Sequence, residues 1–498
     1  MKAYLGIDIG TFETKGVLVD GTGHVLARAA QPHKMLVPQP GWAEHRPYED
    51  WWADFTAISR KLLNESGVKP GDVKAVGTSA IGPCMLPVDG DGEPLMNAVL
   101  YGVDTRAATE IEELTEAIGG ETILDRCGNA LTSQSVGPKI LWLRRNRPEI
   151  FAKTRKIHTS TSWLVHRLTG TLVIDHYSAS STSPIYAVGA LGYDADLASD
   201  IVDPELLPVP AWTTDIAGEV TARAAEETGL AAGTPVIVGT IDAAAEAISV
   251  GVLDAGDMML MYGSTIFIIT ITANRVRDKR LWYAPWLFPG QHASMSGLAT
   301  SGTLTHWFRD TLARDLDPAK AMIELAAEAE GSPPGANGLV LLPYFSGERT
   351  PIHDPHARGV LFGLNLTHSR GDIYRALLEG IANGTNHIIE TYVEAGADPV
   401  AIYGVGGGTR NRPWAQATSD VSGRTQILRD KTMGASYGDA FLAALAIGDV
   451  RREDIRTWNP VASEIVADPA TAPVYRRQYA VFKDIYARTH DLMRRLEA

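Results

Sequence analysis

The feature that most constrains the fold is a strand, turn, strand pattern that occurs twice. The first copy reads AYLGIDIG at 3–10 and KGVLVD at 15–20, and a turn rich in Asp and Gly leads to a third strand, HVLARAA. The second copy is GDMMLMYGSTIFIITIT at 256–272, where Gly-Ser-Thr joins two strands rich in β-branched residues. Copies near the start and the middle of the chain predict two related halves.

A chain of 498 residues is long enough for two large domains, given about 100–200 residues per domain. We place the domain change near residue 250, which gives domains of 1–250 and 251–498. Helical patterns alternate with the strands, for example at 48–67, 369–396 and 434–448. This alternation predicts the α/β class.

Composition excludes several function classes. The formal net charge is −14 and no basic stripe occurs, so we expect neither a nucleic-acid partner nor an anionic membrane partner. Cys84 and Cys127 form no CxxC motif, which argues against a zinc cluster and a disulfide framework. Because no secretory signal and no run of about 20 apolar residues is found, we expect a cytoplasmic protein that does not span a membrane.

Asp8 is an acid inside an otherwise apolar strand, where an unpaired carboxylate is costly. Gly10 allows close approach of an anion, Thr11 offers a hydroxyl, and Lys15 offers a positive charge. With these neighbours Asp8 can hold a hydrated magnesium ion beside the phosphates of a nucleotide. The alternative is a hairpin turn in which Asp8 caps local amides, and the motif alone does not decide between them.

Asp242 lies in VIVGTIDAAAEAISVG at 236–251, where an apolar strand runs into a helix rich in alanine. An acid at this corner is either a first-turn residue favoured by the helix dipole or a general base aimed into a cleft. Both readings stay open at this point.

Two further glycine motifs suit phosphate binding. Gly263, Ser264 and Thr265 form the turn of the second strand pair, and GVGGGTRN at 404–411 follows a strand and precedes a helix. The second motif is not GxGxxG, and no GxxxxGK[ST] occurs in the chain. A nucleotide would therefore be bound by neither a Rossmann nor a P-loop motif.

Taken together, these motifs resemble the FGGY carbohydrate kinases of the actin-like ATPase superfamily. The resemblance covers nearly the whole chain, and its most specific part is 347–363, within YFSGERTPIHDPHARGVLFGLNLTH at 344–368. It implies a two-domain α/β fold of the actin-like (ribonuclease H-like) type, with the active site in the interdomain cleft. The N-terminal FGGY-type domain, 1–250, would bind sugar and phosphate, and the C-terminal one, 251–498, would bind the nucleotide.

The resemblance also implies cofactors and residue roles. ATP and Mg²⁺ are the expected cofactors, with Asp242 as the base that takes the proton of the sugar hydroxyl. Asp8 would hold magnesium through water, within a first phosphate motif that includes Gly10, Thr11 and Lys15. The expected remaining nucleotide contacts are Gly263, Ser264 and Thr265 for the transferring phosphates, and Gly407, Gly408 and Asn411 for the α-phosphate and adenosine.

The general pattern is most similar to the xylulokinases of this family, which implies phosphorylation of D-xylulose to D-xylulose 5-phosphate. Asp104 and Arg106 are candidate sugar ligands, although Asp104 can equally cap a helix. Gly82-Pro83 stands where xylulokinases usually have Met-His, and Ala243 stands where an amide often follows the base. Pro83 is therefore a further candidate in the sugar site, and the sugar pocket can differ from that of xylulokinases.

Alternatives remain at the level of the substrate. The acceptor can be another small sugar or polyol, such as ribulose, a hexulose, erythritol or glycerol. A more distant alternative is an actin-like ATPase without a sugar acceptor. The assembly is left open, with a homodimer among the alternatives.

Overall fold

The computed structural model describes residues 2–497, and the chain divides into two compact units. The first comprises Met1–Leu253, Tyr283–Ala293 and Met433–Asn459, and the second comprises Asp254–Trp282, Ser294–Thr432 and Pro460–Ala498. The boundary predicted near residue 250 lies close to Leu253. The prediction did not include the segments 283–293 and 433–459 in the first unit, because a division made along the chain cannot detect later segments that pack with earlier ones.

The first unit contains a seven-stranded sheet in the order β13-β14-β5-β1-β2-β3, with β15 paired to β5. Its strands are β1 (Ala3–Ile9), β2 (Glu13–Asp20), β3 (Val25–Pro32), β5 (Val73–Ala80), β13 (Ile216–Glu219), β14 (Pro235–Ile237) and β15 (Thr240–Ile241). β1 pairs antiparallel with β2, and β2 pairs antiparallel with β3. The predicted meander at the start of the chain is therefore confirmed.

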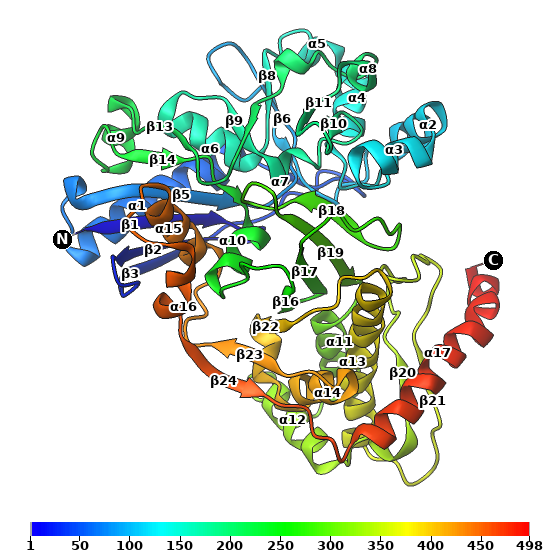
Figure 1. Cartoon of the computed structure of the whole chain (residues 1–498). Coiled ribbons are helices and arrows are strands. Elements are labelled where there is room, and N and C mark those ends of the chain that lie inside the picture. The colour runs from blue at the N-terminus through cyan, green and yellow to red at the C-terminus, as the bar shows by residue number, and fades with distance from the viewer. Residues whose placement is uncertain (1, 498) are drawn as a thin grey trace. The chain divides into compact units, whose positions relative to one another are not determined.

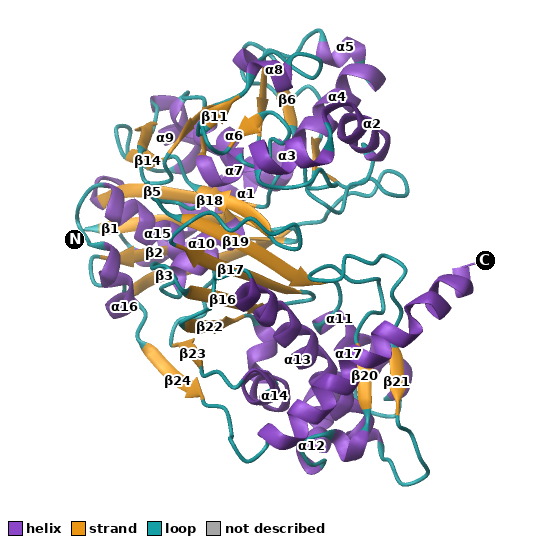
Figure 2. Cartoon of the chain, turned by 45° about the vertical axis from the view of Figure 1, so that its right-hand side comes forward, coloured by secondary structure: helices purple, strands orange, loops and turns teal. Residues whose placement is uncertain are grey.

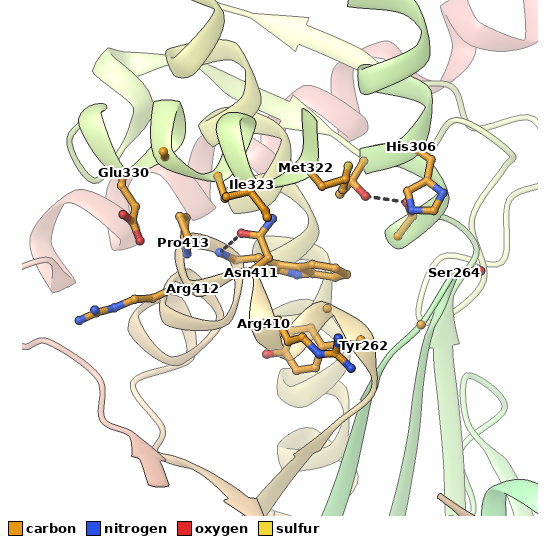
Figure 3. A pocket seen from close by; sticks show the side chains of 18 residues that line it. Tyr262, Ser264, His306, Met322, Ile323, Glu330, Arg410, Asn411, Arg412 and Pro413 are labelled. Atoms are coloured by element: carbon orange, nitrogen blue, oxygen red, sulfur yellow. Dashed lines mark hydrogen bonds between the residues drawn. The ribbon is translucent and has the colours of Figure 1, made fainter. Parts of the chain in front are cut away.

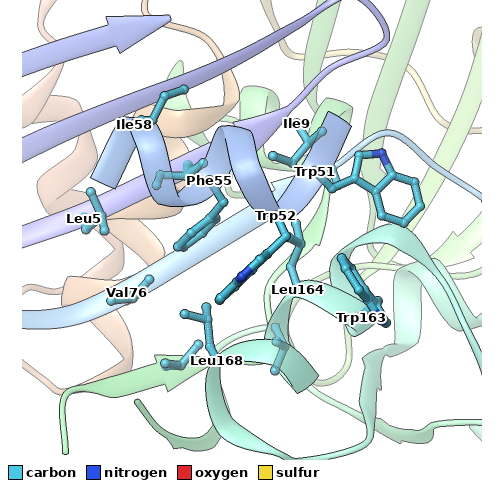
Figure 4. Close-up of a cluster of buried hydrophobic side chains, with 14 of the residues drawn as sticks. Leu5, Ile9, Trp51, Trp52, Phe55, Ile58, Val76, Trp163, Leu164 and Leu168 are labelled. Carbon is cyan, nitrogen blue, oxygen red and sulfur yellow. The ribbon is translucent and has the colours of Figure 1, made fainter. Parts of the chain in front are cut away.

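The core of this unit lies between the sheet and two helices, α1 (Ala53–Ser66) and α6 (Ser160–Thr169). Figure 4 shows Phe55 of α1 near Leu5 of β1, and Trp163 of α6 belongs to the same buried cluster. The rings of Trp52 and Phe55 are stacked with centroids 5.7 Å apart. These large buried rings hold the strand that carries Asp8 in place.

Two other helices, α10 (Asp242–Ser249) and α15 (Ala435–Ala446), pack against β5, and α15 also packs against β1 and α10 (Figure 1). Glycines allow this close packing. A Cβ atom at Gly77 of β5 would lie 2.2 Å from the carbonyl oxygen of Asp439. A Cβ atom at Gly438 of α15 would lie 1.9 Å from the carbonyl oxygen of Ala245.

Between β5 and β14 the chain forms a long insertion of short strands and helices. Its elements are β6 (Leu86–Val88), β7 (Ala98–Val99), α2 (Ala108–Ile118), α3 (Gly120–Cys127), α4 (Val136–Asn146), α5 (Pro148–Phe151), β8 (Lys156–His158), α6, β9 (Val173–Asp175), α7 (His176–Ala179), β10 (Tyr186–Ala187), β11 (Gly192–Tyr193), α8 (Ala195–Ala198), β12 (Val209–Ala211), β13 and α9 (Ala222–Thr228). β7 pairs with β4 (Glu44–His45).

A second seven-stranded sheet has the order β18-β19-β17-β16-β22-β23-β24. Its strands are β16 (Asp257–Tyr262), β17 (Ile266–Thr272), β18 (Trp282–Pro285), β19 (His292–Leu298), β22 (Ala401–Val405), β23 (Gln426–Arg429) and β24 (Val461–Ile465). β16 pairs antiparallel with β17 and parallel with β22, as β1 pairs antiparallel with β2 and parallel with β5. The repeat predicted from the two strand pairs is confirmed in this topology.

The helices of the second unit include the long α13 (Arg370–Glu394), which begins with a capping box at Ser369 and confirms the helix predicted at 369–396. The others are α11 (Gly302–Leu312), α12 (Ala321–Gly331), α14 (Arg412–Ser422) and α17 (Ala472–Arg494). A hairpin of β20 (Val340–Leu342) and β21 (Val360–Phe362) lies beside α17 (Figure 2).

Candidate active site

Asp8 and Asp242 lie at the same edge of the first sheet. Asp8 of β1 is opposite Ser79 of β5, and Ser79 is in turn opposite Thr240 of β15. Both pairings are parallel, so these strands end at one edge, where α/β sheets place their ligand sites. Asp242 follows β15 directly as the first residue of α10. The structure therefore brings the two predicted carboxylates together.

The Asp8 carboxylate is buried, and the Ser79 hydroxyl lies 3.0 Å from its Oδ1 atom. Burial raises the pKa of Asp8 well above its usual value, and the negative charge of Asp242 raises it further. Lys15, opposite Asp8 on β2, lowers that pKa, but its own side chain is about half exposed and pairs with Glu13 at 3.3 Å. An ionised Asp8 therefore needs a stronger cation than Lys15 alone supplies.

The turn after β1 is tight, and two histidines that lie outside the turn contact its backbone. The Gly10 N–H donates to the Glu13 carbonyl at 3.0 Å, and a Cβ atom at Gly10 would lie 2.9 Å from that oxygen. Imidazole nitrogens approach two carbonyls of this turn: His33 Nε2 lies 2.9 Å from Gly10 O, and His45 Nε2 lies 3.1 Å from Thr11 O. Neither histidine was predicted as part of the site, because nothing in the sequence around them indicates that they reach this turn.

Asp242 is partly buried, and its Oδ1 atom accepts a hydrogen bond of 2.7 Å from the Ala243 N–H. Burial raises the pKa of Asp242 to about 7, against the effect of that hydrogen bond, and the charge of Glu246 raises it further. Glu246 lies one helical turn later on α10 and was not predicted as part of the site. A carboxylate with a pKa near neutrality is suited to take a proton from a hydroxyl group.

In the second unit, a cavity of about 580 Å³ is lined by five of the six nucleotide-binding residues predicted in that unit (Figure 3). Its lining includes Gly263 and Ser264 from the turn between β16 and β17, and Gly407, Gly408 and Asn411 from the loop after β22. Thr265 is outside this lining, and its carbonyl closes the turn by accepting from the Gly263 N–H at 3.1 Å.

The cavity has an apolar wall and a glycine edge. Met322 and Ile323 of α12 lie near Asn411 in Figure 3, and Asn411 also caps α14 by accepting from the Trp414 N–H at 3.2 Å. A Cβ atom at Gly408 would lie 2.5 Å from the Trp414 ring, so only glycine fits there without a shift. An apolar wall suits a base, and exposed backbone beside glycines suits phosphates.

Asp104 and Arg106 form a buried ion pair. Arg106 Nη2 lies 2.7 Å from Asp104 Oδ2 and 2.9 Å from Glu44 Oε1, and the guanidinium carbon lies 3.9 Å from the centre of the Trp42 ring. Asp104 also accepts from the Ala43 N–H at 2.7 Å. These contacts describe a structural network, and the role of the pair as sugar ligands stays a prediction.

Pro83 is buried just beyond the end of β5, at the sheet edge where Asp8 and Asp242 lie. A Cβ atom at its neighbour Gly82 would lie 2.8 Å from the side chain of Ile241, the residue before Asp242. Gly82 thus places the chain next to the predicted base.

Family models for the N-terminal and C-terminal domains of the FGGY family of carbohydrate kinases match residues 3–249 and 258–447. The chain belongs to the FGGY family of carbohydrate kinases. The family and the two-domain, actin-like α/β fold predicted from the motifs are thereby confirmed.

Similar proteins extend over the full chain. The xylulose kinase of Bacillus subtilis is 28% identical over 99% of this chain and 98% of that protein, and that of Escherichia coli is 28% identical over 98% of this chain and 100% of that protein. The crystal structure of xylulose kinase from Rhodospirillum rubrum is 32% identical, covers 99% of this chain and 100% of its own, and has a TM-score of 0.93. Among the described residues, no helix has the length and apolar character needed to cross a membrane.

Proposed function

We propose that this FGGY family member transfers the γ-phosphoryl group of ATP to a terminal hydroxyl of a small ketose, with D-xylulose as the first candidate and D-xylulose 5-phosphate as the product. The position of Asp242 carries the proposal. A carboxylate with a pKa near 7 at the end of parallel strands, beside Asp8, is what a base for an alcohol acceptor requires. The full-length similarity to xylulose kinases supports the choice of sugar.

In this proposal Asp242 takes the proton from the acceptor hydroxyl as the hydroxyl oxygen bonds to the γ-phosphorus of ATP, the bond from that phosphorus to the β–γ bridging oxygen breaks, and ADP leaves. Phosphoryl transfer passes through a loose transition state, so the protein contributes mainly by positioning groups and by stabilising charge. Gly10, Thr11 and Lys15 would contact the phosphates from one turn, and Gly263, Ser264 and Thr265 from the other. Gly407, Gly408 and Asn411 would contact the α-phosphate and the adenosine.

The residues around Asp8 fit magnesium bound through water. Among the described residues no cluster of three or more side chains could ligate a metal ion directly, and magnesium beside a nucleotide usually needs only one or two carboxylates together with waters and phosphates. When bound, magnesium neutralises charge on the phosphoryl oxygens. Asp8 would orient its water ligands.

A second acceptor remains a candidate because two positions differ from the xylulokinase pattern. Gly82-Pro83 and Ala243 lack the imidazole and amide that would pair with sugar hydroxyls, and contacts of that kind discriminate most strongly between sugars. Ribulose, a hexulose or a polyol is therefore the alternative. A homodimer and a cytoplasmic location also stay predictions.

The test is an acceptor panel. The purified enzyme is incubated with MgATP and, separately, with D-xylulose, D-ribulose, L-ribulose, fructose, erythritol and glycerol, and ADP release is measured. We expect release to depend on the acceptor and to be fastest with D-xylulose, with phosphate on the terminal carbon by ³¹P NMR. ADP release at the same rate without any acceptor would contradict the proposal and favour an actin-like ATPase.

A further inference from the structure

Helix α15 carries a further buried carboxyl group, that of Asp439, which contacts Ser79. Asp439 is fully buried and is the only charged residue of α15. Its backbone lies directly against Gly77 of β5, since a Cβ atom there would approach the Asp439 carbonyl to 2.2 Å. The residue is thus fixed next to the strand that carries Ser79.

The hydroxyl of Ser79 lies between two carboxyl groups. Its Oγ atom is 2.7 Å from Asp439 Oδ2 and 3.0 Å from Asp8 Oδ1. A hydroxyl has one proton, so it donates to one of these oxygens and must accept a hydrogen bond from the other. Accepting requires that one of the two carboxyl groups is protonated.

The unpaired carboxyl oxygen of Asp439 favours Asp439 as the group that keeps the proton. Burial, and after it the negative charge of Asp8, raise the pKa of Asp439 well above its usual value. Asp439 Oδ1 is buried without a hydrogen-bond partner among the described residues, which is tolerable for a neutral carboxyl and very costly for a carboxylate. Even when neutral, an acid here stabilises the helix packing less than an apolar residue would, so its presence calls for a function.

We propose that Asp439 is a positioning residue that acts on Asp8 through Ser79. Asp439 donates a hydrogen bond to Ser79, and Ser79 donates to Asp8 Oδ1. The second oxygen of Asp8 is thereby held in the orientation that binds the magnesium of MgATP through water. This inference rests on the proposed function, because it assigns Asp8 to the magnesium nucleotide.

The test compares two substitutions at one position. Asp439→Asn keeps an N–H donor toward Ser79, whereas Asp439→Leu has a similar volume but no donor. Ser79→Ala removes the middle of the chain of hydrogen bonds, and Ser436→Ala, on the same helix, is the control. Calorimetry measures the Kd of ATP with excess magnesium and again with EDTA, and thermal unfolding reports stability.

We expect the magnesium-dependent gain in ATP affinity to fall about tenfold or more in Asp439→Leu and Ser79→Ala, the usual effect of losing a partner of a metal-ligating group. Asp439→Asn and Ser436→Ala should stay within about threefold of the parent. Binding in EDTA should be equal in all proteins, and Asp439→Leu should melt at or above the temperature of the parent. A role in space filling alone would not produce this magnesium-dependent difference.

Three results would overturn the inference. They are parental MgATP binding by Asp439→Leu, equal losses in Asp439→Asn and Asp439→Leu, and a parent that binds ATP no better with magnesium than without it. If Asp439→Leu does not fold, the magnesium-dependent gain in ATP affinity is compared between Ser79→Ala and Asp439→Asn. A loss in Ser79→Ala without a loss in Asp439→Asn would support the inference, and equal values would overturn it. No sugar is needed, so a negative acceptor panel would count against the proposed function while this comparison still tests the position of Asp8.

Discussion

The acid limb of the pH profile should report the ionisation of Asp242. Burial raises its pKa from 3.8 to about 7, and the base must be deprotonated to accept a proton from the sugar. The active fraction therefore falls as the pH falls through 7, to about a tenth at pH 6 and about a hundredth at pH 5. With an unperturbed carboxylate, more than about nine-tenths would remain active at pH 5.

Glu246 provides an internal control for this profile. Its charge raises the pKa of Asp242, and it lies one helical turn away, at about 6 Å. Replacing it in Glu246→Gln removes one screened negative charge, so the acid limb should move down by about 0.5–1 pH unit. The ionisation of ATP is the same in both proteins, so a difference between their profiles belongs to the protein.

The assay is kcat/KM for the preferred sugar from pH 5 to pH 9 at saturating MgATP, for the parent and for Glu246→Gln. A profile that is flat down to pH 5 would refute the assignment of Asp242 as a base with a raised pKa. A limb that does not move in Glu246→Gln would assign the ionisation to another group, such as the nucleotide.

Three further predictions concern packing and binding. Gly438→Ala should cost about 1–3 kcal/mol of unfolding free energy and lower the melting temperature by several degrees, because the new Cβ atom would lie 1.9 Å from the Ala245 carbonyl oxygen; an unchanged melting temperature would contradict the packing. Arg106→Ala should cost about 3–5 kcal/mol in urea unfolding, because it leaves buried carboxylates unpaired; loss of activity at full stability would instead favour a sugar ligand. Gly408→Val should weaken ATP binding in calorimetry by displacing the Trp414 ring from the cavity wall, and parental affinity would exclude Gly408 from the nucleotide site.

Local patterns were enough to predict the strands, corners and loops that carry the candidate site residues. The strand and turn of Asp8 and Gly10, the strand-to-helix corner of Asp242, and the glycine loop at Gly407 are each formed within a few residues. Their place at strand ends follows from the alternation of strands and helices.

The remaining parts depend on contacts between distant segments. Asp439 reaches Ser79 across 360 positions of sequence, and His33 and His45 reach the turn at Gly10 and Thr11 from later strands and loops. Nothing in the short helix motif around Asp439 distinguishes it from an exposed acid. Such partners are found only when the fold shows which helix packs on which strand.

The contacts of Asp104 and Arg106 illustrate a different limit. The residue types suit a sugar ligand and a helix cap equally well, and neither reading predicts the buried network that they form with Glu44 and Trp42. Burial between two chain segments far apart in sequence is not encoded in the local pattern.

The role of Asp242 as the base is tested most directly with the Asp242→Asn enzyme. Asparagine preserves the shape of the side chain but cannot accept the proton, so phosphorylation of the preferred sugar should slow by about 10²–10⁴-fold while the Kd of MgATP stays at the parental value. Turnover within tenfold of the parent would rule out Asp242 as the base, because the group proposed to activate the acceptor hydroxyl would then be dispensable.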